Sequence, residues 1–311
     1  DTMSRDSLEE TIARFVEWGA DILVLNTGCG AAEKLLDVAR GIAPKTPVAL
    51  DLKNWRCLPS LLDAGADMLM SVDEELVREL LPCRDEDRCP AIVAVPQVCG
   101  GGRIASLHRA VNALRSRGYT RVIADPIVDP PTPLGLYRVL RVYDEASKVL
   151  DTPLLAGLCN VVELIDTDSP GLVMALTMLF AEVGASVLLV TEASRKTFGA
   201  VKEASTASAM VSVASALSKP PKDLGLDLLI LKEKEGLDIR EPHDVAEIIE
   251  ASSSGTVELD PAGSFRIGVS RRGGYLWALY MGRKGRILIR GRRAADIYRA
   301  VSYTHLTLPT N

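Results

Sequence analysis

Short apolar runs rich in Val, Ile and Leu recur along the chain, and stretches with the spacing of amphipathic helices separate them. Near-continuous apolar runs are typical of parallel strands that helices cover on both faces. Because strands and helices alternate, the pattern predicts the α/β class. The predicted strands are Ile22–Leu25, Pro47–Leu52, Met68–Val72, Ala91–Val95, Arg121–Ala124, Pro153–Leu158, Ser186–Val190 and Leu226–Leu231.

The junctions that lead into several of these strands resemble one another. Each has a glycine at or just before the start of a strand, where a left-handed residue ends the preceding helix. The four junctions are Gly19-Ala20-Asp21, Gly65-Ala66-Asp67, Gly184-Ala185-Ser186 and Gly225-Leu226-Asp227. Repeated junctions favour a repeated strand–helix unit, and we predict a TIM barrel of the (β/α)8 type. A doubly wound open sheet is the alternative, but no G-x-G-x-x-G follows the first predicted strand.

The pattern changes after Lys219-Pro220-Pro221, toward short strands separated by glycine turns. The elements predicted there are strands at Phe265–Val269, Tyr275–Tyr280 and Arg286–Ile289 and a short helix around Ala294–Val301. Residues 302–311 have neither periodicity nor charge and are interpreted as a non-native tail. The predicted domains are therefore a barrel (1–218), a linker with an extra strand and helix (219–254) and a small β-rich α+β domain (255–301).

Composition narrows the class of protein. The chain has 311 residues, 47% of them hydrophobic and 25% charged, which is enough for a barrel and a small second domain. A formal net charge of -5 without a long basic stripe argues against a general nucleic-acid binder. No apolar run reaches the ~18–20 residues that cross a bilayer, and the first residues do not resemble a signal peptide, so a cytoplasmic protein is expected.

The cysteines and histidines do not form a metal-binding pattern. No Cys-x-x-Cys pair occurs, and the three histidines lie far apart in the sequence. We therefore expect no metal site, and reduced thiols as in other cytosolic proteins. The six cysteines are Cys29, Cys57, Cys83, Cys89, Cys99 and Cys159.

Polar residues stand at the carboxyl ends of most predicted strands, where ligands bind in barrels of this kind. They are Asn26, Thr27, Asp51, Lys53, Asn54, Ser71, Asp73, Gln97, Asp125, Asn160, Thr191 and Glu192. Asp125 directly follows an apolar run, and a buried carboxylate needs hydrogen-bond donors. Asn160 also follows an apolar run, and its amide both donates and accepts. For Asp125, ligand binding and a structural role in capping the next turn both remain open.

A second candidate site follows the predicted strand at Ser186–Val190. Ser194-Arg195-Lys196 precedes a long helix that is predicted to extend to about Leu217. Two cations and a hydroxyl group at the beginning of a helix can bind an anion such as phosphate. A helix start with solvated cations is the alternative interpretation.

Several segments, taken in order, resemble the pterin-binding barrel of dihydropteroate synthases over roughly residues 10 to 300. They are Gly19-Ala20-Asp21-Ile22, Val48-Ala49-Leu50-Asp51, Gly65-Ala66-Asp67-Met68, Asp125-Pro126 and Glu258-Leu259-Asp260-Pro261-Ala262-Gly263. The resemblance is closest to archaeal dihydropteroate synthase-related proteins, which join such a barrel to a small C-terminal domain. It implies that the family's first strand precedes Asp1, so that Leu226–Leu231 either completes the barrel or joins the second domain.

Some synthase motifs are replaced in this chain. Their Ser-Thr-Arg-Pro-Gly loop aligns with Asn26-Thr27-Gly28-Cys29-Gly30, and their Arg-x-His on the last strand aligns with Leu189-Val190-Thr191. Two other segments, Gly157-Leu158-Cys159-Asn160-Val161 and Asp125-Pro126-Ile127-Val128, resemble methyltetrahydrofolate:corrinoid methyltransferases. In that family the corresponding Asp and Asn bind the pterin.

Both resemblances imply a site for a reduced pterin, whose 2-amino-4-oxo edge presents adjacent N–H groups to a carboxylate. Asp51, Asp125 and Asn160 would bind the pterin, and Ser194, Arg195 and Lys196 a phosphate. The implied reaction joins a dihydropterin methyl diphosphate to an arylamine in folate or methanopterin-type cofactor biosynthesis. The alternatives are methyl transfer from a methyl-tetrahydropterin to a corrinoid protein, and a non-catalytic pterin-binding protein. A Mg²⁺ requirement and a homodimer are left open.

Overall fold

The chain divides into two compact units, Asp1–Glu235 and Gly236–Asn311, which are described separately. The computed structural model describes residues 5–52, 65–85, 89–97, 102–131, 135–229, 247–250, 263–270, 273–282 and 285–307. The predictions made for Lys53, Asn54, Cys57, Cys99 and Glu258–Ala262 concern residues outside the described part of the chain. Among the described helices, none is long and apolar enough to span a membrane.

The first unit contains a sheet of seven parallel strands, ordered in space as in the sequence. The strands are β1 (Leu23–Thr27), β2 (Val48–Leu52), β3 (Met68–Val72), β4 (Ala91–Ala94), β5 (Val122–Ala124), β6 (Leu154–Gly157) and β7 (Ala185–Leu189). These correspond to the first seven predicted strands. Strands β1 and β7 are the two edges of the sheet as the structure describes it.

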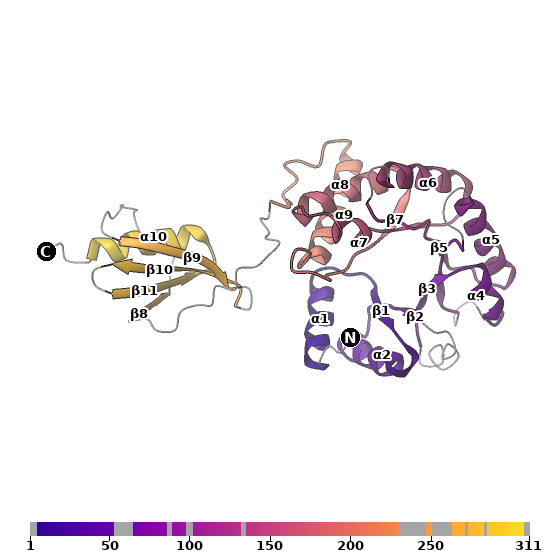
Figure 1. Ribbon diagram of the computed structural model, residues 1–311, viewed down its shortest axis with the longest axis horizontal. Coiled ribbons are helices and arrows are strands. Elements are labelled where there is room, and N and C mark those ends of the chain that lie inside the picture. Colours follow the sequence, from indigo (N-terminus) through magenta and orange to yellow (C-terminus); the bar gives the residue numbers. More distant parts are fainter. Residues whose placement is uncertain are drawn as a thin grey trace. The chain divides into compact units, whose positions relative to one another are not determined.

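Helices alternate with these strands and lie around the outside of the curled sheet (Figure 1). They are α1 (Arg5–Glu17), α2 (Cys29–Ile42), α4 (Glu74–Glu79), α5 (Arg103–Ser116), α6 (Gly135–Val149), α7 (Cys159–Val162), α8 (Ser169–Glu182) and α9 (Ala200–Leu217). The curled parallel sheet with outer helices confirms the predicted TIM-type architecture, with seven strands described in place of eight.

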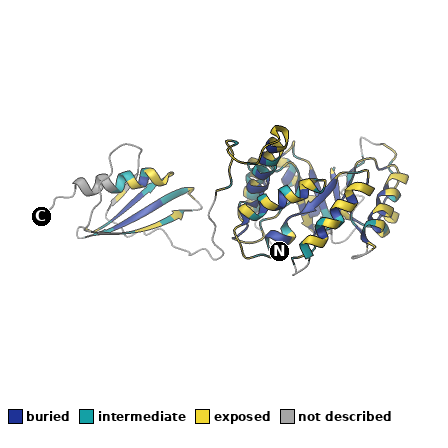
Figure 2. Cartoon of the chain, turned by 90° about the horizontal axis from the view of Figure 1, so that it is seen from above, coloured by how far each residue is buried: buried dark blue, intermediate teal, exposed yellow. Residues whose placement is uncertain are grey.

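The alternation of side chains along the strands builds two apolar layers. One set faces the helices and forms the main core, in which Leu50, Leu69 and Ile92 are fully buried. The other set faces the inside of the curl and includes Ala49 and Met68. Figure 2 shows the strands mostly buried and the outward faces of the helices exposed. The near-continuous apolar strands of the sequence thus reflect burial on both faces of the sheet.

Four glycines stand at the predicted junctions with the left-handed backbone that the sequence analysis assigned to them. Their φ angles are +91° at Gly19, +90° at Gly65, +92° at Gly184 and +78° at Gly225. The first three lead into strands. The fourth does not: residues 226–229 form no strand, and residues 230–231 lie outside the described part. The eighth predicted strand is therefore wrong over the residues that the structure describes, where Leu229 is 91% exposed.

The second unit is a four-stranded sheet with one helix. Its elements are β8 (Glu247–Glu250), β9 (Gly263–Ser270), β10 (Tyr275–Gly282), β11 (Gly285–Gly291) and α10 (Ala294–Thr307). Strands β9, β10 and β11 form the predicted antiparallel meander, and β8 adds to β11 in parallel. Helix α10 continues beyond Val301, because no glycine or proline interrupts the sequence before Thr307.

The expectation of reduced thiols is wrong for Cys83 and Cys89, which form a disulfide. Two backbone hydrogen bonds position them: Cys83 N–H donates to the carbonyl of Arg117, and Cys89 N–H donates to that of Asp85. The resulting Cα–Cα distance of 5.9 Å lies within the range that a disulfide spans. The sequence could not show this, because the pairing depends on contacts with the distant Arg117.

Candidate functional site

Asp125 directly follows β5 and organises the loop between β5 and α6. Its Oδ1 accepts hydrogen bonds from the Ile127 N–H at 2.8 Å and from the Tyr143 hydroxyl at 3.2 Å. Ile127 has a φ of +68°, a left-handed conformation that is uncommon for a β-branched residue. The Asp125 side chain thus holds a sharp turn at the carboxyl end of the sheet.

The environment of this carboxyl group changes its acidity. Burial raises the pKa of Asp125 to about 6, although the Ile127 N–H, the Tyr143 hydroxyl and the charge of Arg103 oppose the rise. At pH 7 the group is still mostly ionised. It is therefore a partly desolvated carboxylate, which binds N–H donors more strongly than a fully hydrated one does.

Arg103, the first residue of α5, fixes the same loop from the other side. Its guanidinium group donates to the Ile127 carbonyl at 3.0 Å and to both carboxylate oxygens of Asp129 at 2.9 Å. The residue is only 4% exposed. The sequence analysis does not include Arg103 among the candidate site residues, because it does not follow a predicted strand. A cation directly after a glycine run, at a helix start, was the available but weak signal.

Asn160 lies in the short helix α7, which follows β6. Its Nδ2 donates to the carbonyl of Val128 at 2.7 Å, and its side chain is otherwise exposed. Asp125 and Asn160 therefore contact the same segment, residues 125–128, and the structure brings these two predicted residues together. Cys159 lies next to them, and burial raises the pKa of its thiol.

Asp51 lies elsewhere on the rim of the sheet. It is on β2, next to Asn26 of β1, and accepts a 2.7 Å hydrogen bond from the Asn26 amide. Strands β3 and β4 separate it from the Asp125 loop. Among the described contacts, none joins Asp51 to Asp125 or Asn160. The three predicted pterin residues thus lie at one end of the sheet, and the side chains of two of them, Asp125 and Asn160, contact the same loop, residues 125–128.

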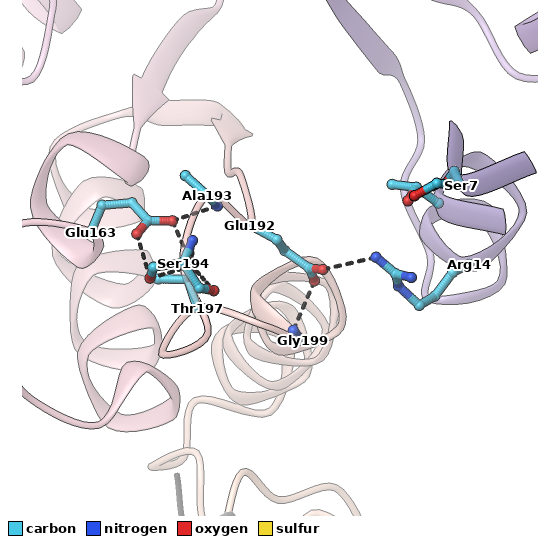
Figure 3. Close-up of polar contacts among 9 residues, drawn as sticks. Ser7, Arg14, Glu163, Glu192, Ala193, Ser194, Thr197 and Gly199 are labelled. Atoms are coloured by element: carbon cyan, nitrogen blue, oxygen red, sulfur yellow. Dashed lines mark hydrogen bonds and ion pairs between the residues drawn. The ribbon is translucent and has the colours of Figure 1, made fainter. Parts of the chain in front are cut away.

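Ser194, the first residue of the candidate phosphate site, binds a carboxylate of the chain itself. The Glu163 carboxylate, just after α7, accepts hydrogen bonds from the Ser194 hydroxyl at 2.7 Å, the Thr197 hydroxyl at 2.5 Å and the Ala193 N–H at 2.8 Å (Figure 3). Burial alone would raise the pKa of Glu163, but these three donors and the charge of Lys196 hold it below its usual value.

The two cations of this segment have different environments. Lys196 is buried, and its ammonium group donates to the carbonyl oxygens of Glu163 and Ile165. It therefore ties the end of α7 to the loop before α9. Arg195 is exposed. The predicted long helix after this segment is α9, which ends at Leu217 as expected.

The N-terminus of α9 also faces a carboxylate of the chain. Glu192 accepts a 2.8 Å hydrogen bond from the N–H of Gly199, and its other oxygen lies 3.3 Å from the guanidinium of Arg14 on α1 (Figure 3). The Glu192 side chain is only 4% exposed, and burial raises its pKa. Arg14 also lies over the rings of Trp18 and Phe198. This contact joins α1 to the loop that follows β7.

A cavity of about 610 Å³ lies along the sheet edges β1 and β7, between α1 and α9. Apolar side chains of both edges line it, together with Met68, Met70 and Leu155 from the inside of the curl. Asp125 and Asn160 are not among its lining residues. Within the described part of the chain, no three His, Cys, Asp or Glu side chains are grouped so as to hold a metal ion.

Comparison with known proteins shows the fold but not the activity. No family model matches the chain. A protein of Methanocaldococcus jannaschii described only as uncharacterized is 31% identical over 314 residues, which cover 95% of this chain and 59% of that protein. The chain thus spans about three fifths of this relative's length.

The similar solved structures are barrels. Dihydropteroate synthase from Thermus thermophilus has a TM-score of 0.51 at 21% identity, over 68% of this chain and 88% of that one. A truncated 3-deoxy-D-arabino-heptulosonate 7-phosphate synthase from Thermotoga maritima has a TM-score of 0.52 at 17% identity, over 70% of this chain and 84% of that one. A dihydropteroate synthase from Coxiella burnetii, in complex with pteroic acid, has a TM-score of 0.50 at 17% identity, over 69% of this chain and 87% of that one. At these identities, the likeness shows that the first unit has the barrel fold of these synthases.

Proposed function

We propose that the chain binds a reduced pterin at the carboxyl end of its sheet and acts as a transferase on the group that the pterin carries. The observation that carries this proposal is the 125–128 loop, where an ionised, partly desolvated carboxylate and an exposed amide contact one backbone segment. A pterin edge offers adjacent N–H donors to Asp125, and the Asn160 amide can donate to or accept from a ring nitrogen. The fold shared with dihydropteroate synthases supports the proposal.

The first candidate reaction joins a dihydropterin methyl diphosphate to an arylamine, with release of diphosphate. Its support is the barrel fold and the sequence resemblance to dihydropteroate synthases. Catalysis would come from holding the two reactants together and from stabilising the departing diphosphate. Measured diphosphate release that depends on both substrates would support this reaction, and no release with any arylamine would reject it.

The second candidate reaction is methyl transfer from a methyl-tetrahydropterin to a corrinoid protein. The observation that favours it is the position of Asn160 beside the 125–128 loop, because both segments resemble pterin-binding motifs of corrinoid methyltransferases. A change in corrinoid absorption on mixing with the chain and methyl-tetrahydropterin would support it. If a folded chain that binds pterin gives neither this change nor diphosphate, the chain is a pterin-binding protein without either activity.

A further inference from the structure

Three hydrogen-bond donors in the loop before α9 converge on one negative group. The hydroxyls of Ser194 and Thr197 and the N–H of Ala193 all point at the Glu163 carboxylate, at distances of 2.5–2.8 Å (Figure 3). Such an arrangement of donors is an oxyanion receptor, because each donor would serve a phosphate oxygen equally well. Here the occupant is a side chain of the chain itself.

The helix N-terminus next to this receptor is filled in the same way. The first N–H groups of a helix attract anions, and at α9 the Glu192 carboxylate accepts from Gly199. Its ion pair with Arg14 and its 4% exposure hold the carboxylate in place. A phosphate group would therefore have to displace a carboxylate of the chain, Glu163 or Glu192, to reach these donors, although the exposed Arg195 lies in the same loop.

The charge of the buried Lys196 lowers the pKa of Glu163, but its ammonium group makes its hydrogen bonds elsewhere. The Lys196 ammonium group donates to carbonyls at the end of α7, and the residue is 6% exposed. Glu163 follows Asn160 by three residues, so the filled receptor adjoins the amide proposed to hold the pterin. Glu163, which fills the receptor, therefore lies one helical turn after the amide that is proposed to hold the pterin.

We propose that the loop at residues 193–197 is an oxyanion receptor that Glu163 fills, and that the neighbouring site selects a pterin whose side chain carries no phosphate. The second half rests on the proposed function, since it concerns the same pterin site. The Glu163 carboxylate occupies the donors that a diphosphate would need and repels its negative charge, whereas a pterin without phosphate meets neither obstacle. Within the proposed transferase, this selection favours a reaction in which the pterin gives up an uncharged group such as methyl.

The receptor can be tested without any pterin. Inorganic diphosphate is titrated calorimetrically into the wild-type chain, Glu163→Ala and Glu163→Gln. We expect no binding by the wild type at low-millimolar diphosphate, and at least tenfold tighter binding once the carboxylate is removed. Glu163→Ala with Thr197→Val should lose this gain, because one of the three donors is gone. Equal binding by the wild type and Glu163→Ala, or none by any folded variant, overturns the receptor.

Glu163→Gln keeps the shape of the side chain and guards against a variant that does not fold. Circular dichroism and a thermal unfolding curve establish folding for each protein before titration. If Glu163→Gln binds diphosphate more tightly than the wild type does, the negative charge of Glu163, and not the bulk of its side chain, excludes the anion. If neither variant folds, the donors are removed one at a time with Ser194→Ala and Thr197→Val. Each substitution should raise the pKa of Glu163, which NMR measures. An unchanged pKa of Glu163 in both variants overturns the receptor.

Selectivity is tested with two pterins that differ in phosphate alone. The probes are 6-hydroxymethyl-7,8-dihydropterin and its diphosphate. We expect the wild type to bind the alcohol at least tenfold more tightly, and Glu163→Ala to narrow the difference. Diphosphate binding as tight as alcohol binding in the wild type overturns the selection. If the folded wild type binds neither pterin while Glu163→Ala binds inorganic diphosphate, the proposed function fails and the receptor stands.

Discussion

At the scale of single residues, Asp125 shows how a fold can raise the energy of a charged group that a ligand would then stabilise. Folding raises its pKa from 3.8 to about 6 through burial, so the folded state favours the protonated acid. The contribution of this group to stability is fully present below about pH 4 and is lost as the pH rises through 6. At pH 7 the chain holds an ionised group at a cost in stability.

Asp125→Asn should remove that cost. An amide oxygen can still accept from the Ile127 N–H and the Tyr143 hydroxyl, and an amide does not ionise. We expect the free energy of unfolding of the variant, relative to the wild type, to rise by about 1–3 kcal/mol between pH 4 and pH 7. Urea denaturation at several pH values measures it. Asp144→Asn, on the exposed face of α6, is the matched control. If the difference in unfolding free energy between Asp125→Asn and the wild type were the same at pH 4 and pH 7, the raised pKa of Asp125 would be contradicted.

The two candidate residues that the sequence singled out, Asp125 and Asn160, were recognisable because each directly follows an apolar run. Their partners were not recognisable. Glu163 lies 31 residues before Ser194, and Arg103 lies 26 before Asp129, so only the folded chain shows the pairs. A sequence shows which polar groups stand at strand ends, but their hydrogen-bond partners depend on tertiary contacts.

At the scale of elements, Arg103 links the start of α5 to the loop between β5 and α6. Arg103→Met would leave the Ile127 carbonyl and the Asp129 carboxylate without this partner. We expect a loss of about 2–3 kcal/mol in the free energy of unfolding. Chemical denaturation measures it, with Arg109→Met as the control on the same helix. The exposed pair of Arg109 with Glu74 should contribute less than about 1 kcal/mol, and equal losses would contradict the assignment.

Gly268 on β9 makes a close contact that only glycine allows. It lies opposite Trp277 of β10, and a Cβ at this position would come within 2.4 Å of the tryptophan ring. Gly268→Ala should lower the free energy of unfolding of the second unit by about 1–3 kcal/mol. The near-ultraviolet circular dichroism of Trp277 during chemical denaturation measures this change. Gly171→Ala on α8, where a Cβ meets nothing within 4 Å, is the control and should not lower stability. No effect of Gly268→Ala would contradict the contact.

Element prediction succeeded where periodicity and a junction glycine agreed, as at Gly65 and β3. At Leu226–Leu231 both signals were present, yet residues 226–229 form no strand. An apolar run becomes a strand only when it pairs with an edge, and residues 226–229 pair with neither described edge of the sheet, β1 or β7. Pairing is a property of the whole sheet, so the run alone could not decide it.

At the scale of the whole molecule, the candidate site lies entirely in the first unit, since Asp125, Asn160 and Glu163 all precede residue 235. A fragment of residues 1–229 should therefore keep the full chain's affinity for a reduced pterin within about twofold. Calorimetry on the fragment and the full chain makes the comparison, after circular dichroism has shown that the fragment is folded. A folded fragment that binds much more weakly would place part of the site in the second unit.

The central claim is that a reduced pterin binds through the Asp125 carboxylate. Its most direct test is calorimetric titration of a reduced pterin into the wild-type chain and Asp125→Asn at pH 7.5, and into the wild type at pH 5. The account predicts binding that weakens at least tenfold in the variant, and also weakens at pH 5, where Asp125 is mostly protonated. No binding by the folded wild type, or equal binding by Asp125→Asn, would contradict it.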